Sequence, residues 1–147
     1  MNYDYFASQE GLTKLLNDYN EVFTLLDDIS QQLLQGIVTT TDDFRTVLNQ
    51  ATGAYGTIEP LYSLAIAYKE NAELRYYVEK KRELEGKGEK VVAASLDKES
   101  SDAVADIRRV RNILEGYSNV AEKLIITAQT QLKRIDNDGK YKPQEEA

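Results

Sequence analysis

The 147-residue sequence contains no cysteine and no histidine. The lack of cysteine excludes disulfides and thiolate metal sites, and the lack of histidine removes the commonest metal ligand and general base. Ser-His-Asp and Cys-His catalysis and histidine-bound zinc are therefore excluded, while carboxylate-bound magnesium stays open. We expect a protein that is not an enzyme and has no catalytic residues, no metal site and no cofactor.

Proline, glycine and long apolar runs are also scarce. Two prolines and eight glycines supply too few turns for a β-sandwich, so the fold class that we expect is all-α. We find no apolar segment of the signal-peptide type and no apolar run of about 18 residues, the length that suits a membrane span. We therefore expect a cytoplasmic protein without a membrane partner.

Apolar residues recur every three or four positions in three segments, which predicts three helices. The first helix is expected over about residues 8–35. The second is expected over 41–85, with Thr40 as a cap, because a threonine side chain can accept a hydrogen bond from a free N–H of the first turn. Pro60 removes one backbone hydrogen bond, so we expect a kink near 57–60.

The third helix is expected over 97–136, followed by a flexible tail at 138–147. Its apolar side chains alternate steps of three and four, as the a and d positions of a coiled coil do; they are Ile107, Val110, Leu114, Tyr117, Ala121, Leu124, Ala128, Gln131 and Ile135. We expect a long antiparallel, coiled-coil-like helical hairpin with an additional N-terminal helix, forming a single domain over 1–137. Val120, Ile125 and Ile126 lie off this seam and predict a homo-oligomer.

Charge is distributed unevenly along the chain. Residues 1–66 carry two basic and nine acidic side chains, which leaves a net charge of −7, whereas residues 67–147 carry sixteen of each sign. Such an asymmetry indicates two surfaces with different partners. The candidate protein-interaction residues on the acidic part are Asp27, Asp28, Asp42 and Asp43, for which a solvated anionic surface is the alternative interpretation.

The segment KKRELEGKGEK, residues 80–90, is the one place where basic residues surround glycines. It lacks the G-x-x-x-x-G-K-[ST] pattern and the preceding strand of a phosphate-binding loop. Two interpretations remain open: the end of a helix followed by a glycine in the left-handed conformation, or a basic loop that contacts a nucleic-acid backbone.

Further aromatic and basic residues lie close to this segment in the sequence. Tyr77 lies off the apolar stripe and could stack on a base, as aromatic side chains of single-strand binders do. Arg108 and Arg111 lie three apart on one helical face and could join the same basic patch if the hairpin forms. The alternative is an ordinary solvated face.

The order of these features resembles the recombination mediator (UvsY-like) family of tailed phages over about residues 38–136. The resemblance rests on LYSLAIAYKENAELRYYVEKKRELEG, the glycine-rich basic loop, VVAASLDKES and DAVADIRRVRNILEGYSNVAEKLIITAQTQLKRI. It implies a non-enzymatic DNA recombination or replication accessory protein. Such a protein would form a homo-oligomer in the host cytoplasm and bind single-stranded DNA together with a recombinase or a single-strand binding protein.

By this resemblance the nucleic-acid-binding residues are Lys80, Lys81, Arg82, Lys87 and Lys90, with Arg108, Arg111 and Tyr77 added from the patterns above. Two other functions fit the sequence. One is a helical adaptor or inhibitor whose acidic surface binds a host protein. The other is a virion assembly or scaffolding protein.

Overall fold

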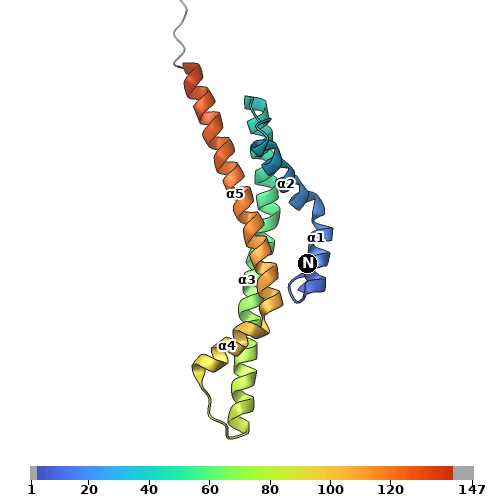
Figure 1. Cartoon of the computed structure of the whole chain (residues 1–147), viewed down its shortest axis with the longest axis vertical. Coiled ribbons are helices and arrows are strands. Elements are labelled where there is room, and N and C mark those ends of the chain that lie inside the picture. The colour runs from blue at the N-terminus through green and yellow to red at the C-terminus, as the bar shows by residue number, and fades with distance from the viewer. Residues whose placement is uncertain (1–2, 141–147) are drawn as a thin grey trace, which may run out of the picture. The chain divides into compact units, whose positions relative to one another are not determined.

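The computed structural model describes residues 3–140, and every regular element in that range is helical. A short 3-10 helix, η1 (Tyr3–Tyr5), precedes five α-helices (Figure 1). These are α1 (Gln9–Asp18), α2 (Asn20–Leu34), α3 (Thr41–Gly86), α4 (Ala93–Ala103) and α5 (Ala105–Lys140). The all-α prediction is confirmed.

The chain divides into two compact units, and both long helices contribute to each. Unit 1 contains residues up to Asp18 together with Pro60–Glu115, and unit 2 contains Tyr19–Glu59 together with the chain from Gly116 onward. The prediction of a single domain over 1–137 stays a prediction.

Unit 1 is built from η1, α1, the second part of α3, α4 and the first turns of α5. Its fully or almost fully buried apolar side chains are Tyr5, Phe6, Leu12, Leu15, Leu61, Ala65, Leu96, Val104, Val110 and Leu114. The ring of Phe6 packs against that of Tyr68, with centroids 6.0 Å apart. Gly11 lets the backbone of η1 lie directly on α1, because a Cβ atom at this position would be 2.0 Å from the carbonyl oxygen of Asp4.

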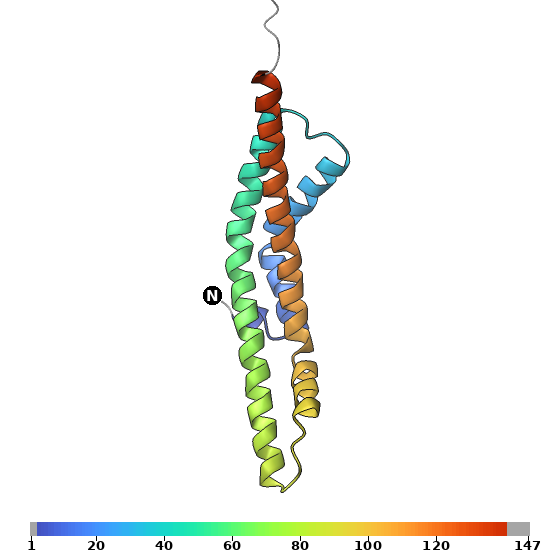
Figure 2. The ribbon, with the colours of Figure 1, turned by 90° about the vertical axis from the view of Figure 1, so that its left-hand side faces the viewer.

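Unit 2 is built from α2, the first part of α3 and the larger part of α5, and these segments lie side by side (Figures 1 and 2). Its buried apolar side chains are Phe23, Leu26, Ile29, Phe44, Val47, Ala51, Ala54, Ile58, Ala121, Leu124 and Ala128. The buried hydroxyl of Ser118 donates a hydrogen bond to Glu59. The charge of Glu59, and also that of Glu122, raises the pKa of Tyr55. Glu122 follows Ser118 by one turn of α5, and Tyr55 precedes Glu59 by one turn of α3. The two segments therefore run in opposite directions within unit 2.

The structure corrects the first and third predicted helices. The helix expected over 8–35 is interrupted at Tyr19, whose φ of −108° and ψ of 21° leave the α region. The helix expected over 97–136 is likewise interrupted at Val104, where φ is −106° and ψ is 22°. Val104 is buried, although the apolar seam predicted for the third helix begins only at Ile107.

The predicted flexible tail at 138–147 begins too early, since α5 continues through Gly139 to Lys140; residues 141–147 lie outside the described part of the chain. The second helix agrees with its expected bounds, and α3 is one continuous helix that includes Pro60. The kink near 57–60 stays a prediction, as does the long coiled-coil hairpin.

Candidate functional site

The turn after α3 contains the sequence that suggested a basic loop. Gly88 has a φ of +70°, the left-handed conformation that glycine adopts without steric cost. The N–H of Gly88 donates to the carbonyl of Glu85 at 3.1 Å, and the N–H of Glu89 donates to that of Leu84 at 3.0 Å. This pair of bonds is a Schellman motif. The interpretation as a helix end with a left-handed glycine is therefore confirmed.

Two of the five candidate cations near this turn share one carboxylate. Glu83 lies 2.9 Å from the ammonium of Lys87 and 3.6 Å from that of Lys80. The hydrogen bond from Lys87, followed by the charge of Lys80, lowers the pKa of Glu83, and the same hydrogen bond raises the pKa of Lys87. These pairs are half-exposed or exposed and therefore weak, but they reduce the positive charge offered to a phosphate.

The other three cations, Lys81, Arg82 and Lys90, are exposed. Within residues 3–140 none of them has a carboxylate at ion-pair distance. Lys90 also borders a small hollow of about 200 Å³ together with Leu84 and Leu96. The positive charge that is available at the end of α3 therefore comes from these three side chains.

Arg108 and Arg111 have other contacts. The guanidinium of Arg108 donates to the carbonyl and the hydroxyl of Ser101, so it joins the first turn of α5 to the end of α4. Arg111 lies 3.7 Å from Glu115, and its Nε is buried without a hydrogen-bond partner. Both side chains are only half-exposed and are engaged within unit 1.

Helix α4 separates these arginines from the cations at the end of α3. Leu96 of α4 lies near Leu84, and Ser100 lies near Tyr77, so α4 runs antiparallel to this part of α3. Arg108 contacts the far end of α4, at Ser101. Eleven residues of helix span about 16 Å. The structure therefore does not bring Arg108 and Arg111 together with Lys81 and Arg82 in one patch.

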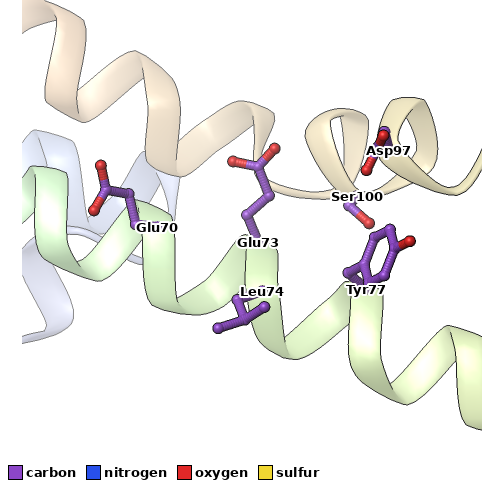
Figure 3. A pocket seen from close by; sticks show the side chains of 6 residues that line it. All are labelled: Glu70, Glu73, Leu74, Tyr77, Asp97 and Ser100. Atoms are coloured by element: carbon purple, nitrogen blue, oxygen red, sulfur yellow. The ribbon is translucent and has the colours of Figure 1, made fainter. Parts of the chain in front are cut away.

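Tyr77 borders a pocket of about 370 Å³ between α3 and α4. Figure 3 shows the other side chains that line it, which are Glu70, Glu73, Leu74, Asp97 and Ser100. Glu73 is held by Lys69 at 2.9 Å, whereas Glu70 and Asp97 have no ion-pair partner in the described part of the chain. A ring surrounded by carboxylates is a poor place for a phosphate backbone, so Tyr77 is better suited to a cationic or apolar group.

Two of the four candidate aspartates stabilise the fold of unit 2. Asp43 accepts hydrogen bonds from the backbone N–H groups of Thr39 and Thr40, each at 3.1 Å. Its own N–H donates to the hydroxyl of Thr40 at 3.1 Å, which completes a reciprocal cap at the start of α3. These hydrogen bonds lower the pKa of Asp43, with the bond from Thr40 as the largest cause.

Asp27 accepts a hydrogen bond from the hydroxyl of Tyr117 at 3.2 Å. Burial and then the charge of Asp27 raise the pKa of this tyrosine, whose ring also packs against Phe23. Asp42 lies 3.7 Å from Arg45 in an exposed pair, and Asp28 is exposed. Asp28 and Asp42 are thus the two aspartates most available to a partner.

Sequence reasoning missed the pocket between α3 and α4 and the hydrogen bond from the buried Ser118 to Glu59. The pocket depends on α4 as a separate short helix, whereas residues 97–103 were expected to form the start of one long helix over 97–136. The buried serine occupies a position where the neighbouring seam residues are apolar, and no sequence signal distinguishes it from an exposed one.

Comparison with models of protein families, with curated proteins and with solved structures found no significant match. In the range 3–140, no three carboxylates are grouped closely enough to hold a metal ion. None of the helices in that range combines the length and the apolar character needed to cross a membrane.

Proposed function

We propose that this protein is a non-enzymatic accessory factor of phage-type DNA recombination or replication, which binds single-stranded DNA and a recombinase partner in the host cytoplasm. The single observation that supports it is the set of exposed cations around the Gly88 turn, Lys81, Arg82 and Lys90, which have no carboxylate partner within residues 3–140. Flexible cations in an exposed turn suit a backbone contact that does not depend on sequence.

The proposal includes a homo-oligomer and a long coiled-coil hairpin formed by α3 and α5. It is supported by the a/d pattern of α5 and by the 53% exposure of Ile126, an apolar side chain on its outer face. Several subunits would multiply a weak contact of three cations, because linked sites bind the same strand with a high effective concentration.

The test is a salt titration of binding to a single-stranded oligonucleotide. Three phosphate contacts predict a slope of log K against log salt of roughly −2 per subunit. Replacement of Lys81, Arg82 and Lys90 by glutamate should abolish binding. The matched control replaces Lys123, Lys133 and Arg134, which are also exposed, by glutamate and should bind as the parent does. No binding at low salt would contradict the proposal.

A second candidate function is an adaptor or inhibitor that binds a basic host protein. The observation that favours it is the acidic surface of unit 2, where Asp28 and Asp42 are exposed. Capture of a defined basic protein by the parent, lost in Asp28→Asn with Asp42→Asn, would support this function. No contact within the described residues favours the third function, virion assembly or scaffolding.

A further inference from the structure

The second part of α3 carries an apolar stripe on its outward face, in addition to the one that packs inside unit 1. The inward stripe continues from Leu61 and Ala65. The outward stripe has steps of three, four, three and four, and its members are Leu64, Ala67, Asn71, Leu74 and Val78. Leu74 is 63% exposed and borders both this face and the pocket beside α4 (Figure 3).

A shallow groove of about 400 Å³ follows this outward stripe. Its lining residues all belong to α3 and are Asn71, Leu74, Arg75, Val78, Glu79 and Arg82. No other helix of the described chain contributes to the groove. An exposed leucine at the centre of a grooved helical face is what an association surface presents before its partner binds.

The spacing assigns heptad positions to this surface. With Leu64, Asn71 and Val78 at a, the d positions are Ala67 and Leu74. Val78 at a and Leu74 at d match the residue preference of two-stranded parallel coils, and a single asparagine at an a position, here Asn71, fixes the register of such pairs. We propose that the outward stripe of α3, residues 64–78, pairs in parallel with the same stripe of a second copy of this chain.

The charges beside the stripe support the parallel direction. In a parallel pair, a residue at g faces the residue at e five positions later in the partner. Glu70 occupies g and Arg75 occupies e, so the two copies form this pair twice. Both side chains are exposed, and neither has an ion-pair partner within residues 3–140.

An antiparallel pair would be unfavourable for the same reason. It would place the e positions of the two copies opposite each other, and these are Arg75 and Arg82. It would also pair Asn71 with an apolar d residue and leave its amide without a partner. The parallel arrangement avoids both costs.

Lys81 and Glu85 occupy the next d and a positions and end the stripe, because like charges would meet across the axis. The paired length is therefore about 21 Å for residues 64–78. Such a short contact predicts a dimer that dissociates on dilution. The inference names one surface for the expected oligomer and does not depend on DNA binding.

The first test uses the absence of native cysteine, which makes one introduced thiol an unambiguous reporter. Asn71→Cys and Val78→Cys should each form an interchain disulfide under mild oxidation, because a positions face each other in a parallel pair. Glu79→Cys, exposed on the same helix but at b, is the matched control and should form no interchain disulfide, although it should still dimerise. Equal crosslinking of the control, or crosslinking at only one of the two a positions, would overturn the proposal.

The second test exchanges the flanking charges and measures the dissociation constant by sedimentation equilibrium. Glu70→Arg and Arg75→Glu should each raise it about threefold or more, because each variant creates two like-charge pairs. The double variant should restore the parent value, and Leu74→Asp should abolish the dimer. A monomer at every accessible concentration, or a double variant as weak as the single ones, would contradict the proposal. These variants leave Lys81, Arg82 and Lys90 in place, so a monomeric variant should still bind the oligonucleotide, but more weakly. A dimer that binds no DNA would contradict the proposed function alone, and a monomeric parent protein that binds DNA would contradict the dimer alone.

Discussion

The two parts of α3 have a similar apolar pattern but different surroundings. In its first part, α3 buries Phe44, Val47, Ala51, Ala54 and Ile58 in the core of unit 2. Beyond Ala65 no side chain of α3 is fully buried, although the inward stripe continues as Tyr68, Ala72 and Tyr76. The first part packs against two long helical segments, whereas much of the second part is covered only by α4. The apolar period of a sequence therefore identifies one face of a helix, and the neighbouring elements determine how much of that face is buried.

The largest expected effect compares one apolar residue from each part. Ile58→Ala should lower the free energy of unfolding by about 2–5 kcal/mol, because Ile58 is completely buried and its truncation leaves a cavity. Leu74→Ala should change it by less than about 0.5 kcal/mol when measured at a concentration where the protein is monomeric. Chemical denaturation of both variants is the measurement, and equal losses would show that the two parts are packed alike.

The next comparison uses two glycines that lie two residues apart at the end of α3. Gly88→Ala should destabilise the protein by about 1–2 kcal/mol, because an alanine is forced into the left-handed conformation. Gly86→Ala should stabilise it by about 0.5–1 kcal/mol, because Gly86 is helical and a Cβ atom there meets no neighbour within 4 Å. Thermal unfolding of the two variants should shift in opposite directions. The same sign for both would mean that the Schellman turn does not end the helix in solution.

At the other end of α3, Thr40→Ala should cost about 1 kcal/mol, because it removes the hydroxyl that accepts the N–H of Asp43. Thr46→Ala is the matched control: Thr46 is exposed within the helix, and alanine is the better helix former. Amide hydrogen exchange should show faster opening of the first turn in Thr40→Ala alone. Unchanged protection there would argue against the cap.

The smallest expected effect is a pH dependence at the same cap. The folded-state pKa of Asp43 is lowered, so its contribution to stability is present above the ordinary value of 3.8 and is lost as the pH falls through the folded-state value. Asp43→Asn should therefore be less stable at neutral pH and should lose less stability on acidification. Thermal melts of both proteins across the acid range measure this difference. Parallel pH profiles would contradict the assigned role of Asp43.

The sequence predicted the helical class and the course of α3, because periodicity, the Thr40 cap and the glycine turn all act locally. It did not predict the breaks at Tyr19 and Val104, since Tyr19 fits the apolar stripe of its helix and no proline or glycine marks either position. The candidate basic residues were also visible as a group in the sequence. The sequence did not show that α4 divides these basic residues into two groups, because α4 was not expected as a separate helix. One group is Lys81, Arg82 and Lys90, and the other is Arg108 and Arg111.

The sequence by itself determined which residues lie on one helical face, where α3 begins and ends, and which catalytic chemistries are excluded. These properties follow from backbone geometry and from the side chains present, and they need no knowledge of distant neighbours. Only the tertiary structure decided which faces are covered and which charges are engaged. Arg108 donates a hydrogen bond to Ser101, Asp27 accepts one from Tyr117, and Leu74 is exposed to solvent. Each of these outcomes depends on which helices pack next to the residue. No local sequence pattern specifies packing partners that are far apart in the chain.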